Sequence, residues 1–483
     1  MKHFFILGRN PELSLAELHA VLPSGWKPVA VSHEVLMAEC AEFDVQEIMK
    51  RLGGTVKMGK IISHNPSQPP SPRFAGEAGL ISDATVRSPT ETSDLRGGKP
   101  LEPPLRVRGG GGSYEDVLAA LSALHLHDRK IFFGLSAYAL DEKTRLPNVR
   151  QLRELGIEVK RALQESGHKV RLVTSREVAL SSVIVKKEKL LTQGAEIVLF
   201  YGTPNTNQSS TSYILRTNFI GRTLAVQEFE EASIRDFGRP ARSMRVGMLP
   251  IQLAKILINL ARAPRTATLL DPFCGLGTIL TEATLMGYKN LIGSDIDPHM
   301  IDATRRNLEW LRQFPPLKVR PASPAKRGEG GEEGLRDAHN LPQPSLTLRE
   351  GAVEELSKHL TPRSVDAIIT EPYMGPTRGI RNYELGIMNE LTKLYVSAFY
   401  EFAKILKSGG KVVFIFPAFN NAGQITKTSA QVLPQIKKLG FTPTPLLLQN
   451  ISTSYLLPTT YSITYSRPDQ RVLREIFVFT FQS

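Results

Sequence analysis

Cysteine is scarce in this sequence. Cys40 and Cys274 are its only two cysteines, and neither lies in a CxxC motif or in a cluster of cysteines and histidines. A disulfide framework would need more cysteines, and a structural zinc site would need clustered ligands. We therefore expect no disulfide framework, no bound metal and a cytoplasmic protein.

Long apolar runs are also lacking. Near the start of the chain, the run Phe4–Leu7 is interrupted at once by Gly8, Arg9 and Asn10. Neither this run nor any other approaches the roughly 18 apolar residues of a membrane-spanning helix. We expect no targeting segment, no membrane segment and no membrane partner.

Two segments lack the apolar periodicity of helices and strands. Residues 64–113 hold eight prolines and eight glycines in fifty positions, and residues 314–345 are similarly rich in both. The two share the pattern S-P-x-x-x-G-E-x-G, at Ser71–Gly79 and at Ser323–Gly331. We expect both to be disordered insertions, and the shared pattern suggests a repeat element inserted twice.

Basic side chains outnumber acidic ones, and most of this surplus lies outside the two segments. The formal net charge is +13 and the sequence pI is about 9.6. Residues 64–113 carry six basic and five acidic side chains, and residues 316–349 carry six and four, so together they supply only +3. Five cations also gather between residues 171 and 189, namely Arg171, Arg176, Lys186, Lys187 and Lys189. Such a surplus is compatible with a polyanionic partner.

The remaining chain alternates between helix and strand patterns and is too long for one core. It divides into residues 1–225 and 246–483, joined by a linker at residues 226–245. In the first part the patterns predict helices and strands in this order: strand 3–8, helix 12–21, strand 33–39, helix 44–51, strand 54–63, helix 114–124, strand 130–139, a helix capped by Asn148 that ends at Gly167, and strand 168–174.

A glycine-containing turn follows an apolar strand in the second part. The stretch "TLLDPFCGLGT" places Asp271, Gly275 and Gly277 after that strand and before a helix. Glycines let the backbone approach a ligand closely, and the helix N-terminus offers N–H groups. Asp295 ends the next strand, twenty residues after Gly275, where an acid can accept hydrogen bonds from both ribose hydroxyls of a nucleoside cofactor.

The stretch "DPFCGLGT" resembles the DPFCGSGT-type motif of S-adenosylmethionine-dependent amino-methyltransferases. Residues 237–261, the opening "FILGRNPELSLAEL" and the closing "YSRPDQRVLREIFVF" resemble THUMP-domain tRNA guanine-N2 methyltransferases. The resemblance implies S-adenosylmethionine as cofactor and tRNA as partner. It assigns cofactor binding to Asp271, Phe273, Cys274, Gly275, Gly277, Asp295, Ile296 and Ala352.

The same resemblance implies a fold and a substrate. The C-terminal region would be a Rossmann-like class I methyltransferase domain of α/β class, with a seven-stranded mixed sheet that ends in an antiparallel hairpin. An α+β ferredoxin-like and THUMP region would precede it and grip tRNA, while guanosine-10 is modified.

The stretch "TEPYMGP" follows the expected fourth strand, where the family has an Asp/Asn-Pro-Pro-aromatic loop. The resemblance therefore assigns catalysis to Glu371, Pro372 and Tyr373. Here Glu replaces Asp or Asn, and the second proline is missing, so Tyr373 comes one position early and Met374 stands where the aromatic would be. Arg378 and Arg381 follow, where they could meet substrate phosphate.

Two other functions stay open at this point. DNA adenine-N6 and cytosine-N4 methyltransferases also contain DPFCGLGT-like motifs, and the altered catalytic loop is compatible with an inactive RNA-binding relative. The target nucleotide, single or double methylation and the need for an activating subunit are likewise open.

Overall fold

The structure is a computed structural model of the 483-residue chain, and it carries no ligand. It describes residues 1–64, 113–122, 130–202, 217–242, 248–313, 344–376, 384–421, 423–447, 459–467 and 470–482. The two expected insertions, apart from their edges, and the shared S-P-x-x-x-G-E-x-G pattern lie outside the described residues, as do Arg378 and Arg381.

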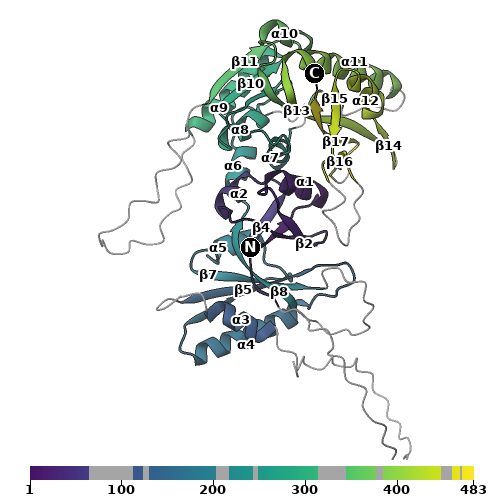
Figure 1. Cartoon of the computed structure of the whole chain (residues 1–483). Helices are drawn as coiled ribbons and strands as arrows, with labels where there is room; N and C mark the ends of the chain where they lie inside the picture. The colour runs from purple at the N-terminus through teal and green to yellow at the C-terminus, as the bar shows by residue number, and fades with distance from the viewer. Residues whose placement is uncertain are drawn as a thin grey trace, which may run out of the picture.

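The first part of the chain forms one mixed sheet covered by helices (Figure 1). Its elements are β1 (Lys2–Leu7), α1 (Pro11–Val21), β2 (Lys27–Val31), β3 (Val35–Glu39), α2 (Val45–Arg51), β4 (Thr55–His64), α3 (Ser113–Ser122), β5 (Ile131–Ala139), α4 (Val149–Glu165), β6 (Val170–Val173), α5 (Ser182–Lys187), β7 (Gly194–Tyr201) and β8 (Thr217–Val226).

The strands of this sheet have the order β2-β3-β1-β4-β8-β7-β5-β6. β5 is parallel to β6 and β7, whereas β7 pairs with β8 and β8 with β4 in antiparallel fashion. Asn148 begins α4 with a capping box. The Asn148 side chain accepts from the Gln151 backbone N–H, and the Gln151 side chain accepts from the Asn148 backbone N–H. The cap predicted from the sequence is confirmed.

The second part forms another sheet. Its elements are α6 (Phe229–Phe237), α7 (Ile251–Leu260), β9 (Thr268–Asp271), α8 (Thr278–Leu285), β10 (Asn290–Asp295), α9 (Pro298–Gln313), β11 (Ser345–Glu350), the 3-10 helix η1 (Val353–Glu355), α10 (Leu356–His359), β12 (Val365–Thr370), α11 (Glu384–Ile405), β13 (Leu406–Asn421), β14 (Gln424–Lys427), α12 (Ser429–Lys437), β15 (Phe441–Thr444), β16 (Ser462–Tyr465) and β17 (Val472–Phe481).

Seven strands of this sheet lie in the order β11-β10-β9-β12-β13-β17-β15, and β14 and β16 add to β13 and β17. β9 to β13 are parallel, whereas β17 is antiparallel to β13, β15 and β16. This order confirms the class I methyltransferase fold expected above. The antiparallel pair β16 and β17 is the expected closing hairpin, and the full sheet has nine strands rather than seven because of the two short additions.

The two parts of the chain contact each other through helices. α1 packs against α7, and apolar residues of both parts form one buried cluster that includes Leu13, Leu18, Leu253 and Leu257. Figure 1 shows α1 and α2 lying directly beneath α7. A second cluster on the other face of the C-terminal sheet is rich in aromatic rings, among them Phe399, Phe414 and Phe416. No helix in the described ranges is both long enough and apolar enough to span a membrane.

Candidate active site

Four turns lie together at the carboxyl ends of the parallel strands of the C-terminal sheet. β9, β10, β11 and β12 run parallel in adjacent positions, so the turns that follow them lie side by side. Ligands of open α/β sheets bind in the crevice outside these carboxyl ends. The turns contain the residues to which the sequence pointed, namely Asp271 to Gly277, Asp295 and Ile296, Ala352, and Glu371 to Tyr373.

The turn after β9 uses glycine where a side chain would not fit. Gly275 and Gly277 have φ angles of 50° and 77°, in the left-handed region that favours glycine. A Cβ on Gly277 would lie 2.8 Å from Cγ2 of Thr304 in α9. The Gly277 N–H donates to the Cys274 carbonyl, and α8 begins directly after it. The turn is therefore tight, and its backbone is open to close approach by a ligand.

Asp295 ties the first turn to the second. Its Oδ2 accepts from the Gly275 N–H at 2.9 Å and its Oδ1 from the Asp297 N–H at 3.0 Å. Burial raises the pKa of this carboxyl group above its ordinary value. Each carboxylate oxygen keeps a second lone pair, so Asp295 can still accept from ribose hydroxyls. The neighbouring Ile296 side chain is 72 % exposed and offers an apolar surface at the same edge.

The turn after β11 adjoins Asp295. The Gly351 N–H donates to the Asp295 carbonyl at 3.0 Å, and Ala352 precedes η1. A nucleoside whose ribose bound Asp295 would therefore meet Ile296 and Ala352 around its base. The acceptor Asp295, the glycine turn and the small Ala352 side chain fit S-adenosylmethionine, which when bound supplies a methyl group on its sulfonium.

Asp271 lies beneath the turns rather than on their surface. Its side chain is 2 % exposed, and Oδ1 accepts from Thr370 Oγ1 at 2.7 Å and from the Phe273 N–H at 3.3 Å. Burial, with smaller contributions from the charges of Asp295 and Glu371, raises the pKa of Asp271 to about 7. Asp271 thus links the glycine turn to the turn that contains Glu371.

Phe273 and Cys274 support the glycine turn from below. Phe273 packs against the aromatic-rich cluster, and Cys274 is 5 % exposed, with its N–H donating to the Ser294 carbonyl. Burial raises the pKa of the Cys274 thiol above its ordinary value. The thiol is therefore a small apolar group in this turn, and not a nucleophile.

Glu371 forms an ion pair that the sequence did not indicate. Arg474 of β17 donates from Nε to Glu371 Oε1 at 2.5 Å, and both side chains are largely buried. Among the described residues, neither the second oxygen of Glu371 nor the Pro372 carbonyl has a hydrogen-bond donor. The only sequence signal for Arg474 was the unusual Glu at position 371.

Tyr373 and Met374, the two residues after Pro372, lie in different environments. The Tyr373 side chain is 59 % exposed, whereas Met374 is partly buried and packs against the core. The hydroxyl of buried Tyr395 in α11 donates to the Tyr373 carbonyl at 2.6 Å and fixes the turn. Tyr373 therefore presents a ring to solvent beside Glu371, and Tyr395 is a supporting residue that sequence patterns did not identify.

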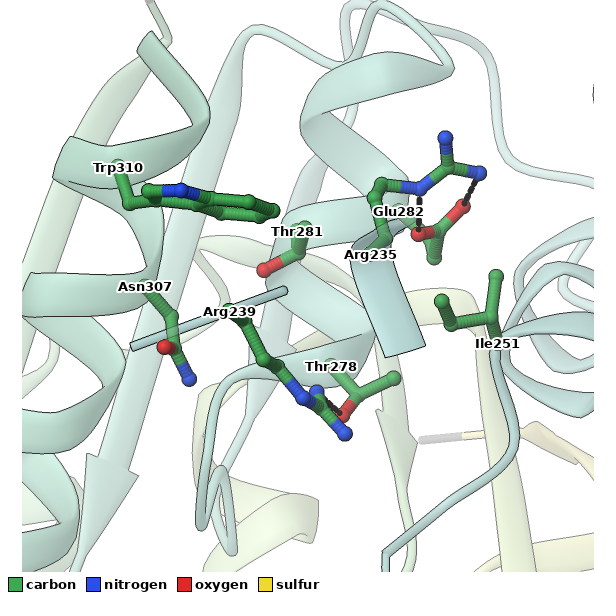
Figure 2. Close-up of a pocket in the computed structure, with 8 residues that line it drawn as sticks. All are labelled: Arg235, Arg239, Ile251, Thr278, Thr281, Glu282, Asn307 and Trp310. Carbon is green, nitrogen blue, oxygen red and sulfur yellow. Dashed lines mark hydrogen bonds and ion pairs between the residues drawn. The ribbon is translucent and has the colours of Figure 1, made fainter. Parts of the chain in front are cut away.

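A second layer of polar contacts lies behind the glycine turn, and it involves the expected linker at residues 226–245. Figure 2 shows Arg235 of α6 in a double contact with Glu282 of α8, and Arg239 reaching Thr278 at 2.9 Å. Asn307 of α9 accepts from the Ala241 N–H and donates to the carbonyls of Ala241 and Leu276. Part of the linker is thus a helix, and it is held against the glycine turn.

The cations between residues 171 and 189 are only partly available to a ligand. Arg171 pairs with Glu188, and Lys186 pairs with Glu228 and Glu230. Arg176, Lys187 and Lys189 are exposed, and no ion pair to them is found within the described ranges. This surface is less positive than the sequence suggested, because acids neutralise two of its five cations.

Comparison with known proteins agrees with this geometry. Residues 239–314 match the RMKL-like methyltransferase domain family. A probable tRNA (guanine(10)-N2)-dimethyltransferase from Methanothermococcus thermolithotrophicus is 30 % identical over 166 residues, which cover 34 % of this chain and 78 % of that protein. The tRNA (guanine(10)-N2)-dimethyltransferase of Methanocaldococcus jannaschii is 31 % identical over 171 residues, which cover 35 % of this chain and 38 % of that protein.

A solved structure is also similar to this chain, at low sequence identity. TrmN from Thermus thermophilus aligns over 100 % of both chains with a TM-score of 0.43 and 16 % identity. The relative from Methanothermococcus thermolithotrophicus is 30 % identical to this chain, and the match covers 78 % of that relative's length. The chain therefore belongs to the tRNA guanine-N2 methyltransferase family.

Proposed function

We propose that this protein transfers a methyl group from S-adenosylmethionine to the exocyclic N2 amine of a guanosine in tRNA, at position 10. The observation that supports this most directly is the contact between the two turns. Thr370 and Asp271 join the cofactor turn to the turn of Glu371, Pro372 and Tyr373 through one hydrogen bond of 2.7 Å. A group bound at the glycine turn would thus lie beside acceptors for an amine.

The residues of the second turn have distinct roles in this proposal. The lone pair of an exocyclic amine is delocalised into the ring, so the amine must be oriented by hydrogen-bond acceptors before it can attack. Glu371, through its free oxygen, and the Pro372 carbonyl accept the two N–H groups of the amine. The exposed ring of Tyr373 stacks on the base, which must leave its own stack to enter the site.

The N-terminal region would bind the RNA. In this proposal residues 1–225 form a ferredoxin-like and THUMP-like RNA-binding region, and residues 246–483 form the methyltransferase domain. The net charge of +13 and the exposed cations Arg176, Lys187 and Lys189 support an RNA surface. Phosphate contacts there would position the tRNA without reading its sequence.

The test is methyl transfer from tritiated S-adenosylmethionine to tRNA or to double-stranded DNA. We expect label in tRNA only, and mass spectrometry of the digested RNA should identify N2-methylated guanosine at position 10. Label in DNA alone would instead support the alternative amino-methyltransferase, and label in neither would indicate an inactive relative.

Two variants separate the two halves of the site. Glu371→Gln should lower transfer at least about 100-fold while cofactor affinity stays within about twofold, because the amine loses a charged acceptor. Asp295→Ala should instead weaken cofactor binding, measured by calorimetry, because the ribose loses its acceptor. Equal losses of cofactor affinity in both variants would contradict these roles.

A further inference from the structure

An arginine from a distant strand contacts the catalytic turn. Arg474 and Glu371 are 103 positions apart in sequence, yet Nε of Arg474 lies 2.5 Å from Oε1 of Glu371. The two side chains are only 13 % and 14 % exposed, so water screens the pair less than it screens a surface ion pair. A charge-assisted hydrogen bond in such a place is strong and directional.

The register of β17 determines the direction of this side chain. Arg474 lies opposite Pro417 of β13 on one side and Tyr465 of β16 on the other, in the middle of the antiparallel sheet. The next residue, Glu475, points to the other face, where it accepts hydrogen bonds from Lys427, Ser429 and Ser462. Arg474 is therefore fixed by its strand and does not follow Glu371 as a mobile surface cation would.

Negative charge is concentrated at this edge of the sheet. Asp295 and Glu371 both raise the pKa of buried Asp271, which indicates that the three carboxyl groups act on one another. Within the described ranges, Arg474 is the only cation that forms an ion pair with any of the three. It thus offsets the repulsion that would otherwise push the Glu371 side chain toward solvent.

The length of the Glu side chain matches the position of Arg474. An Asp at position 371 would withdraw the carboxylate by roughly one C–C bond, about 1.5 Å. The contact, now 2.5 Å long, would then open beyond hydrogen-bonding distance. The departure from the family's Asp or Asn is therefore coupled to an arginine that only a longer acid can reach.

We propose that Arg474 is a positioning residue for methyl transfer, which holds Oε1 of Glu371 so that its second oxygen faces the target amine. This inference rests on the proposed function and adds a residue to the same site. Arg474 would not touch the base itself. It would act by holding Glu371 in one orientation, and misplacing an acceptor by about 1 Å can cost about 100-fold in rate.

The test compares three arginine variants in steady-state methylation of tRNA. Arg474→Met should lower kcat by about 100-fold, with KM for tRNA and cofactor affinity within about twofold of the wild type. Arg474→Lys should recover about tenfold of that loss, because the ammonium keeps the charge and loses only the planar geometry. The matched control is Arg363→Met, which removes an exposed arginine that packs over Phe481 of β17 at the opposite edge, and it should leave kcat unchanged.

A double variant separates positioning from other roles. Adding Arg474→Met to Glu371→Gln should cost no further activity, because the residue to be positioned is already altered. Rates that fall multiplicatively would overturn the inference. A higher KM for tRNA at unchanged kcat would also overturn it, because it would mean that Arg474 contacts RNA.

Thermal unfolding of the wild type, Arg474→Met, Glu371→Gln and the double variant tests the ion pair separately from the proposed function. If Arg474 and Glu371 form the ion pair, the sum of the two single-variant shifts in thermal midpoint should be larger than the shift of the double variant. Additive shifts would overturn the pair whether or not the protein methylates RNA. An active wild type with full activity in Arg474→Met would defeat only the positioning role, whereas a wild type that methylates DNA but not tRNA would defeat the proposed function.

Discussion

Burial changes the acid strength of one carboxyl group at the site. Asp271 is an ordinary aspartate in sequence, yet its burial raises its pKa to about 7. Its acceptor oxygen holds Thr370 and the Phe273 N–H in either protonation state. The charge of Asp271 therefore changes near neutral pH while the link between the two turns is kept.

This pKa predicts a pH-dependent cofactor affinity. A sulfonium cation binds better when Asp271 is ionised, so affinity should increase as pH rises from 6 to 8, by up to about tenfold. Asp271→Asn keeps the acceptor oxygen and removes the charge, and should remove this part of the pH dependence. Calorimetric measurement of cofactor affinity for both proteins at several pH values checks this prediction. The cofactor's own amino group titrates in the same way with either protein, so it does not affect the difference between them. Parallel curves for the two proteins would contradict the prediction.

The residues that sequence patterns identified are those with a local signature. A glycine in a turn between a strand and a helix, an acid at the end of a strand and a proline after a strand can all be recognised from neighbouring residues in the sequence. Arg474 and Tyr395 could not be found in this way, because their roles depend on contacts to residues 371 and 373 that are far away in sequence. The roles of all these residues in catalysis stay predictions until they are tested.

At the scale of elements, strands and helices with strong periodicity were predicted well. The expected helix 12–21 corresponds to α1 (Pro11–Val21), and the expected strand 130–139 corresponds to β5 (Ile131–Ala139). The short edge strands β2 and β14 and the helix α6 were missed, because four to nine residues give too few repeats of a period. Tertiary contacts, such as that of Arg235 with Glu282, hold α6 in place.

The turn before α8 gives a prediction at this scale. Gly277→Ala would combine a strained φ with a Cβ 2.8 Å from Thr304, and should destabilise the protein by about 2 to 4 kcal/mol. Gly275→Ala is the matched control, since its φ is also positive but its added Cβ would lie 4.0 Å from the Phe273 carbonyl oxygen. The control should cost only about 1 to 2 kcal/mol. Chemical denaturation of both variants measures the difference, and equal costs would mean that Thr304 moves aside.

At the scale of the whole molecule, a buried polar cluster joins the two parts of the chain. Glu17 of α1 is fully buried and accepts from the N–H groups of Gly53 and Gly54 and from Asn259 Nδ2 of α7. Burial raises the pKa of Glu17 to about 6 against these hydrogen bonds. Asn259 also donates to the Arg51 carbonyl, so this single amide holds α7 to both α1 and the end of α2.

Removing this amide should loosen the junction. Asn259→Ala leaves Glu17 and Arg51 short of a donor and should cost about 2 to 4 kcal/mol. We expect a lower thermal midpoint and slower methylation of tRNA, with cofactor affinity unchanged, because the N-terminal part, which we propose binds the RNA, would no longer be held in one orientation. Asn290→Ala is the control, since it removes a side-chain hydrogen bond to the Thr266 carbonyl that is exposed and lies inside the C-terminal part. Full activity on tRNA in Asn259→Ala would show that the junction does not orient the substrate.

The contact between Glu371 and Arg474 also has a consequence for the newly made chain. A ribosome that adds about 5 to 20 residues per second needs roughly 5 to 20 s to pass from the one residue to the other. During that interval the glycine turn after β9, made about a hundred residues before Glu371, has its own strands, but Glu371 has no arginine partner. Nascent chains stalled before β17 should therefore acquire the cofactor-binding half of the site before the half that orients the amine.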